Sequence, residues 1–140
     1  MSDCTTIQDT LRLDDLLVDN MKIYQRSDQF CFSIDAVILS HFPIFKPTGN
    51  YIELGTGTGV IPLLCSAFGA NHIIGMEMNP LMAQLAKKSV DFNHRQDKIT
   101  IIEGDYRFLQ QGVEITSDNQ RIVHPLKNHF DGVLMNPPIS

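Results

Sequence analysis

The sequence predicts an α/β protein built on a parallel sheet, and two observations favour this class. Short apolar strands alternate with segments of helical periodicity through most of the 140 residues, and such alternation is typical of parallel sheets with right-handed crossovers. A glycine-rich turn directly follows the first strand of this alternating part, as in sheets that bind ligands beyond the carboxyl ends of their strands. The length allows one modest domain with one hydrophobic core.

Residues 1–45 are expected to form an N-terminal extension with a short helix, a strand and a capped helix. The leucines and acids of Leu11–Leu17 predict a short amphipathic piece, and Lys22–Gln25 is extended. Ser33 is a suitable N-cap for the helix that follows, and Pro43 ends that helix. The apolar face of this helix consists of Ile34, Val37, Ile38 and Phe42.

Residues 46–140 are expected to form the ligand-binding core. Pro62 suits the first turn of one helix, and Asn79 followed by proline caps a second helix. Residues 113–123 predict a hairpin inserted before the last strand, which we interpret as a surface hairpin rather than a substrate contact. The four predicted strands of the core are Tyr51–Leu54, His72–Glu77, Lys98–Ile102 and Phe130–Met135.

Glu53 and the turn Gly55–Gly59 are the first candidate site. Glycine lets the backbone approach a ligand closely and adopt positive φ. A dinucleotide fingerprint would require a third glycine where Val60 stands, and the Gly-Lys-Ser/Thr of a phosphate-binding loop does not follow. The turn therefore favours a nucleotide-like ligand without a pyrophosphate.

Two acidic residues at later strand ends strengthen that interpretation. Glu77 ends the second strand of the core, where a carboxylate can accept hydrogen bonds from both hydroxyls of a ribose. Asp105 follows the third strand and could accept a hydrogen bond from an adenine amino group. A solvated acid would explain Glu77 alone, and a turn cap would explain Asp105 alone. Neither explains as readily why the glycine turn and both acids follow successive strands.

The segment Asn136-Pro137-Pro138 follows the fourth strand and indicates the reaction. The prolines fix the backbone without adding N–H donors. The side-chain oxygen of Asn136 and the carbonyl oxygen of Pro137 can then accept hydrogen bonds from one planar amino group. This arrangement would hold a nitrogen in line with a methyl donor and would act mainly by positioning.

Together these motifs resemble class I S-adenosylmethionine-dependent methyltransferases that act on exocyclic or amide nitrogens. The upstream segments Leu13–Leu17, Lys22–Gln25 and Phe30–Leu39 are similar to bacterial tRNA (valine) adenine-N6 methyltransferases, and the match extends from about Arg12 to Pro138. The resemblance implies the N-terminal portion of a doubly wound, Rossmann-like methyltransferase fold, with its first four parallel strands. It also implies S-adenosylmethionine as cofactor and RNA, above all tRNA, as substrate.

By this resemblance, Asn136 and Pro137 are the catalytic residues that hold the target amine, and no metal takes part. Ile139 stands where adenine-modifying relatives carry an aromatic ring and resembles some guanine-N2 methyltransferases, so guanine N2 stays open as the target. A protein glutamine amide also stays open, because the same motif holds amide nitrogens and the acidic net charge slightly favours a protein. A truncated, non-catalytic fragment that binds the donor is a further alternative. The residues expected to contact the donor are Glu53, Gly55, Thr56, Gly57, Gly59, Glu77, Met78 and Asp105.

Composition and chain length add further expectations. The net charge of −5 supplies no basic surface for binding phosphates. No apolar run is long enough to span a membrane. The three cysteines, Cys4, Cys31 and Cys65, are too widely spaced for a disulfide framework, and this spacing favours a cytoplasmic protein. We expect the fourth strand to lie at an exposed edge of the sheet, so that this chain alone would self-associate and be nearly inactive.

Overall fold

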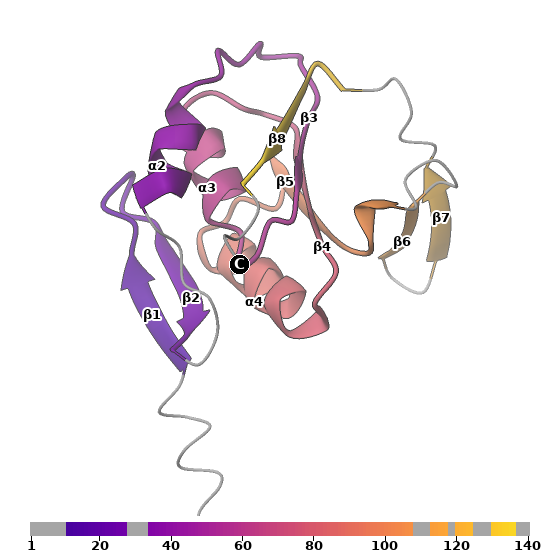
Figure 1. The fold of residues 1–140 in the computed structure, drawn as a ribbon, viewed down its shortest axis with the longest axis horizontal. Coiled ribbons are helices and arrows are strands. Elements are labelled where there is room, and N and C mark those ends of the chain that lie inside the picture. Colours follow the sequence, from indigo (N-terminus) through magenta and orange to yellow (C-terminus); the bar gives the residue numbers. More distant parts are fainter. Residues whose placement is uncertain (1–10, 28–33, 108–112, 118–119, 125–129, 137–140) are drawn as a thin grey trace, which may run out of the picture.

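A four-stranded parallel sheet forms the centre of the computed structural model, which describes residues 11–27, 34–107, 113–117, 120–124 and 130–136. The strand order is β5-β4-β3-β8 (Figure 1). The sheet confirms the predicted fold class and the position of the fourth strand beside the first. Its strands are β3 (Tyr51–Leu54), β4 (Ile73–Glu77), β5 (Ile99–Glu103) and β8 (Gly132–Met135).

Helices cover one face of this sheet and enclose the larger part of the core. Side chains alternate between the two faces of a strand, and Tyr51, Ile73 and Ile99 point to the face where the helices pack, each no more than 4% exposed. The helix residues Leu63 and Ala83 complete this cluster from the other side. The helices are α2 (Ile34–His41), α3 (Val60–Ala67) and α4 (Pro80–Phe92).

The helix α4 follows the sequence prediction closely. The side chain of Asn79 accepts hydrogen bonds from the backbone N–H groups of Leu81 and Met82, which satisfies donors that a helix start leaves free. The face predicted to be apolar is the buried face. Its buried residues are Met82, Ala83, Leu85, Ala86, Ser89 and Val90.

The N-terminal extension differs from the prediction in its first described element. Leu11–Asp15 forms a strand, β1, that pairs antiparallel with β2 (Lys22–Arg26), whereas a short helix was expected in this extension. The expected helix is absent from residues 11–27, because β2 docks on α4 and offers β1 an edge to pair with. The N–H of Tyr24 donates to Ser89 Oγ at 2.8 Å, and Ile23 is 0% exposed.

The helix α2 confirms the predicted element but not its buried face. Ile34, Ile38 and Phe42 are 72%, 52% and 76% exposed, whereas the small residues Ala36 and Ser40 are buried. Small side chains let α2 approach α3 closely, so this packing overrides the apolar pattern. The predicted N-cap Ser33 lies outside the described residues, as do Phe30 and Phe32.

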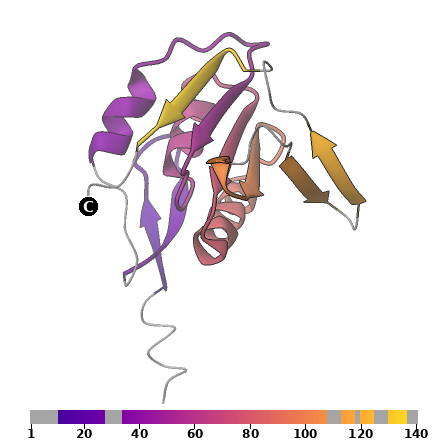
Figure 2. The same ribbon diagram turned by 45° about the vertical axis from the view of Figure 1, so that its right-hand side comes forward.

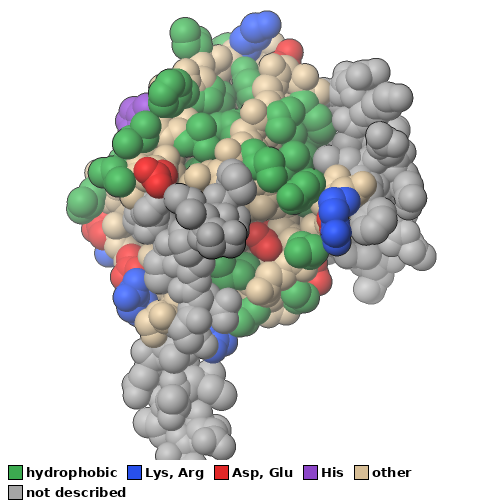
Figure 3. All heavy atoms as spheres, viewed as in Figure 1, with side chains coloured by type: hydrophobic (Ala, Val, Ile, Leu, Met, Phe, Trp, Pro, Cys, Tyr) green, Lys and Arg blue, Asp and Glu red, His purple; other side chains and the backbone are tan. Residues whose placement is uncertain are grey.

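The second face of the sheet carries a smaller apolar cluster of Ile52, Met76 and Ile102, with Phe130 half-buried at its margin. Figure 3 shows hydrophobic side chains gathered across the middle of the face turned to the viewer, where β3 and β8 run in Figure 1. On β8, Val133 is 62% exposed and Met135 is 42% exposed. Apolar surface at this edge strand therefore remains in contact with solvent.

The predicted insertion is a β-hairpin of β6 (Val113–Ser117) and β7 (Gln120–His124), paired antiparallel. Figures 1 and 2 both show it to one side of the central sheet. Within the described ranges, no helix is both long and apolar enough to cross a membrane. The same residues contain no group of three histidines, cysteines or acids placed to hold a metal ion.

Candidate functional site

The predicted site residues meet at one edge of the sheet because the strands are parallel and in register. Leu54 pairs with Met76 on one side and with Met135 on the other. The next residues in the chain, Gly55, Glu77 and Asn136, therefore leave the same edge. Neighbouring strands lie about 4.8 Å apart, and β3 lies between β4 and β8. Glu77 and Asn136 are therefore roughly 10 Å apart, with the start of the glycine turn between them.

Glu77 and Asn136 also belong to the same face of the sheet. Glu77 lies two residues after Gly75, and Asn136 lies two residues after Leu134; Gly75 and Leu134 flank Glu53 on neighbouring strands. Side chains at i and i+2 share a face. The sheet register therefore brings the two side chains to one face, as a shared binding site requires.

The glycine turn is fixed onto β4 by its own backbone. The N–H groups of Gly55 and Thr56 both donate to the carbonyl oxygen of Met76 at 2.9 Å. Gly57, at φ 60°, directs its N–H to Glu77 Oε1 at 2.8 Å. A residue with a side chain would be strained at this φ. The hydrogen bonds to Met76 and Glu77 together hold the turn against the end of β4.

Gly59 has a packing role that the sequence analysis did not identify. It lies at φ 90° directly before α3, and a Cβ placed on it would come within 3.2 Å of the Ala86 side chain on α4. The absence of a side chain therefore lets the turn and α4 pack closely. In a dinucleotide fingerprint the close-packing glycine would fall at the position of Val60. In this motif it lies one position earlier, at Gly59.

Glu77 is bound by backbone donors on both oxygens yet keeps acceptor capacity. Oε1 accepts from Gly57 N and Oε2 accepts from Asn79 N, both at 2.8 Å. A carboxylate offers about four acceptor positions, so about two remain for a ligand. The backbone donors orient the carboxylate at the strand end.

Glu53 is a buried acid with an unsatisfied oxygen. Its side chain is 2% exposed, and neither Glu53 Oε1 nor Thr56 Oγ1 completes a hydrogen bond among the described residues. Burial raises the pKa of Glu53 to about 8; the nearby Thr56 hydroxyl opposes this rise and the Glu77 carboxylate adds to it. Buried polar groups normally have partners, so these two atoms are candidates for contact with a polar ligand group.

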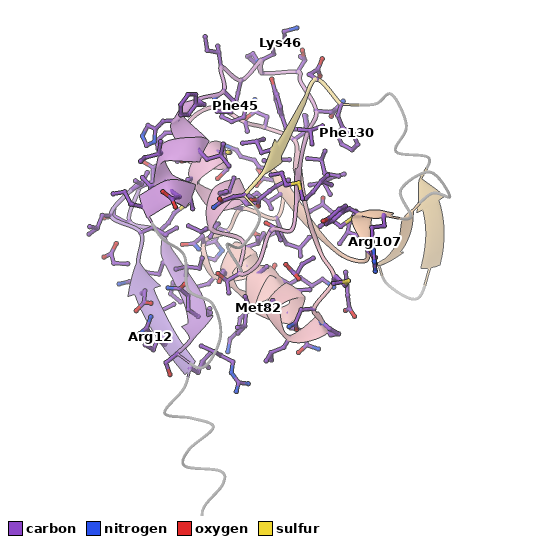
Figure 4. The ribbon with its side chains drawn as sticks, viewed as in Figure 1. Arg12, Phe45, Lys46, Met82, Arg107 and Phe130 are labelled. Carbon is purple, nitrogen blue, oxygen red and sulfur yellow. The ribbon has the colours of Figure 1, made fainter. Side chains whose placement is uncertain are left out.

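Asp105 already has a partner, which the sequence analysis missed. The guanidinium of Arg107 donates to it, with Nε at 3.0 Å from Oδ1 and 2.9 Å from Oδ2, and the backbone N–H of Arg107 donates to Oδ1 at 2.9 Å. These bonds lower the pKa of Asp105. Arg107 lies on the β6 side of the sheet (Figure 4). An arginine two positions after an acidic residue in a turn is the sequence feature that could have predicted this pair.

Of the remaining predicted site residues, the structure describes Met78 and Asn136 but not Pro137. Met78, between Glu77 and the N-cap of α4, is 61% exposed and is free to cover a ligand. Asn136 is half-buried at the end of β8, and Pro137 lies outside the described residues. Met82, labelled on α4 in Figure 4, approaches the turn, since its Cε would lie 3.8 Å from a Cβ on Gly57.

The same architecture occurs in solved structures of other proteins. The structure of Methanocaldococcus jannaschii Trm5 in complex with adenosine superposes with a TM-score of 0.66 at 19% identity, over 93% of this chain and 35% of that chain. Pyrococcus horikoshii TYW2 in complex with MeSAdo gives a TM-score of 0.60 at 18% identity, over 71% of this chain and 38% of that chain. Both likenesses place the chain in the Rossmann-like fold class.

Sequence comparison identifies the family within that class. Residues 34–136 match the family described as ribosomal protein L11 methyltransferase (PrmA), so the chain belongs to it. This membership confirms the predicted assignment to the class I methyltransferases. The match spans the glycine turn and every strand of the central sheet.

Two curated relatives are named for different substrates. A ribosomal protein L11 methyltransferase of Carboxydothermus hydrogenoformans is 30% identical over 50% of this chain and 23% of its own length. A tRNA1(Val) (adenine(37)-N6)-methyltransferase of Porphyromonas gingivalis is 31% identical over 74% of this chain and 39% of its own length. The chain thus spans well under half the length of either relative.

Proposed function

We propose that this chain binds S-adenosylmethionine and forms the donor half of an N-methyltransferase acting on an exocyclic amino group of a base in RNA, adenine N6 of tRNA in particular. The observation that carries the proposal is the convergence of the glycine turn, Glu77 and Asn136 at one edge and one face of the sheet. Family membership and the relatives named methyltransferases support it.

The described residues suit S-adenosylmethionine. The oriented Glu77 carboxylate fits ribose hydroxyls, and the exposed side chain of Met78 can cover the adenine. Glu53 and Thr56 offer unpartnered polar atoms to the amino-acid part of the donor. The acceptor oxygens of Asp105 suit an adenine amino group, although a ligand there would have to share them with Arg107.

The chain's own contribution to transfer is positional. A bound donor would supply a methyl group carried on a positively charged sulfur, which would leave as a neutral thioether. Asn136 and Pro137 would accept hydrogen bonds from the target amine and align its lone pair with the carbon. The nitrogen would release one proton to solvent as the new bond forms, and an amine that is barely basic depends strongly on such orientation.

RNA is supported as substrate by the relative whose name includes tRNA1(Val), which matches 74% of this chain. A protein amide is the second candidate, and the family named for a ribosomal protein supports it. The net charge of −5 also favours a partner other than nucleic acid. The free, buried thiol of Cys65 supports a cytoplasmic location for either activity.

Two experiments separate these functions. Titration calorimetry with S-adenosylmethionine tests donor binding, and a chain that gives no binding heat up to millimolar donor would contradict the whole proposal. Mass spectrometry of bulk tRNA from cells without the gene tests the substrate. We expect loss of one methylated nucleoside, restored by the wild-type gene and not by a gene with Asn136→Ala; unchanged tRNA with a lost protein methylation would favour the protein amide.

A further inference from the structure

The strand β2 lies along α4, and the two elements form one continuous outer surface (Figure 1). The N–H of Lys22 donates to Asn93 Oδ1 at 2.9 Å, and the N–H of Tyr24 donates to Ser89 Oγ at 2.8 Å. Buried and half-buried residues alternate along β2. Because alternate side chains of a strand share a face, Lys22, Tyr24 and Arg26 point together to the outside.

Two side chains of α4 join these outward residues and add an exposed aromatic ring. The ring of Phe92 is 44% exposed and meets the ring of Tyr24 edge to face, with 5.6 Å between the centroids and 88° between the planes. Lys88 Nζ lies 4.4 Å from the centroid of the Tyr24 ring, as in a cation–π contact. The β2–α4 surface consists of the side chains of Lys22, Tyr24, Arg26, Lys88 and Phe92.

The charge of this surface is opposite in sign to that of the whole chain, which is −5. The strand β2 and the helix α4 together carry four lysine or arginine residues and one acid, Asp91. The neighbouring strand β1 adds Asp15, which lies 3.8 Å from Lys22 Nζ. Cations therefore outnumber acids around the exposed ring of Phe92, and the surface complements an anionic partner that also presents flat rings.

We propose that the β2–α4 surface binds an unpaired segment of the RNA substrate, with a base stacked on Phe92 and phosphates at Lys22 and Lys88. This inference rests on the proposed function, because it assigns a binding surface to the substrate proposed there. Unpaired bases of RNA stack on aromatic side chains, and phosphates attract lysine and arginine. An acidic protein would satisfy the cations but would leave the ring of Phe92 unused.

The direction of β2 leads from this surface toward the strand-end site. The hydrogen bonds to Asn93 and Ser89 show that β2 runs opposite to α4, so the end of β2 lies nearer the start of the helix. That start, at Pro80, follows Glu77 closely in the chain. Phe92 lies roughly 18 Å from Pro80 along the helix axis, a distance that about five stacked nucleotides cover at about 3.4 Å each. One RNA segment can therefore occupy both places.

Fluorescence anisotropy with a labelled RNA stem-loop, and with a blunt RNA duplex that has the sequence of its stem, tests this surface. Phe92→Ala should weaken binding of the stem-loop roughly 10-fold and leave binding of the duplex unchanged, because the duplex offers no unpaired base. Phe92→Trp keeps an aromatic ring and should retain the affinity. Lys88→Gln should reduce the slope of log affinity against log salt for the stem-loop by roughly 0.7, the contribution of one phosphate contact in a single strand.

Two matched control variants remove the same groups elsewhere. Lys46→Gln removes an exposed cation at the opposite end of the molecule from Arg12 of β1 (Figure 4). Phe42→Ala removes a ring that is 76% exposed at the end of α2. Both should bind the stem-loop as the wild type does. Calorimetry of every variant with S-adenosylmethionine should give the wild-type affinity, because none of these side chains belongs to the strand-end site.

The outcomes separate this inference from the proposed function. Wild-type affinity for the stem-loop in both Phe92→Ala and Lys88→Gln would overturn the inference, and intact donor binding would leave the proposed function standing. Displacement of the stem-loop by polyglutamate as effectively as by unlabelled RNA would indicate a surface for acidic proteins and would also overturn the inference. A wild-type chain that binds the stem-loop but no S-adenosylmethionine would instead overturn the proposed function.

Discussion

Replacing Glu53 by glutamine should make the protein more stable at neutral and alkaline pH. Glutamine has nearly the same shape but cannot ionise, so the variant avoids placing a charge in a site that is 2% exposed. Its amide can also donate to Thr56 Oγ1, which lacks a hydrogen-bond partner among the described residues. The substitution therefore isolates the cost of ionising one buried carboxyl.

The size of the effect follows from the pKa difference between the folded and unfolded chains. Burial raises the pKa of Glu53 from 4.5 to about 8. Below pH 4.5 both states hold the proton and the group has no effect on stability. Between these values the unfolded chain releases the proton while the folded chain keeps it, so wild-type stability falls with rising pH, by roughly 5 kcal/mol in total above pH 8.

Urea unfolding of both proteins at several pH values between 4 and 9 measures this difference. The free energy of unfolding of the wild type should fall relative to Glu53→Gln across the window, and the two should differ little at the acid end. Glu103→Gln, which removes an exposed acid from the end of β5, provides the matched control and should parallel the wild type. Parallel curves for the wild type and Glu53→Gln would refute the assignment of a protonated Glu53.

Three further predictions concern the turn, a helix cap and the sheet edge. Gly59→Ala, at φ 90° and 3.2 Å from Ala86, should lower the free energy of unfolding by about 1–3 kcal/mol in urea titrations, and by clearly more than Gly55→Ala, whose Cβ would meet nothing within 4 Å. Asn79→Ala should remove the cap of α4 and cost about 1 kcal/mol in the same assay, and no loss would contradict the capping role. The wild-type chain should form oligomers through its exposed β8 edge, measured by size-exclusion chromatography with light scattering. Val133→Lys, at a position 62% exposed, should shift the chain toward monomer. A monodisperse wild-type monomer would contradict this prediction.

Local patterns predicted the elements that depend on neighbouring residues in the chain. The run Tyr51–Leu54 ends in glycine, and Asn79 followed by proline marks a helix start, so β3 and α4 appear where expected. The parallel order then followed from the alternation of strands and helices. Because parallel strands align their carboxyl ends, Glu77 and Asn136 could be brought to one edge without coordinates.

The features that depended on distant residues were not predictable in the same way. β1 is a strand because β2 docks on α4, a contact between segments about seventy residues apart. α2 buries Ala36 rather than Ile38, because close approach to α3 outweighs the apolar pattern. The closeness of Gly59 to Ala86 depends on how two helices pack. The pairing of Arg107 with Asp105 is a local contact between residues two positions apart, so its signal was present in the sequence but was overlooked.

Amide chemical-shift mapping with S-adenosylmethionine tests most directly whether the strand ends form one donor site. Titration of the ¹⁵N-labelled chain should shift the signals of Gly57, Glu77 and Asn136 together, with one common dissociation constant. Signals from β1, at the far side of α4, should stay in place. Shifts that leave Glu77 or Gly57 unmoved at saturating donor would contradict the account.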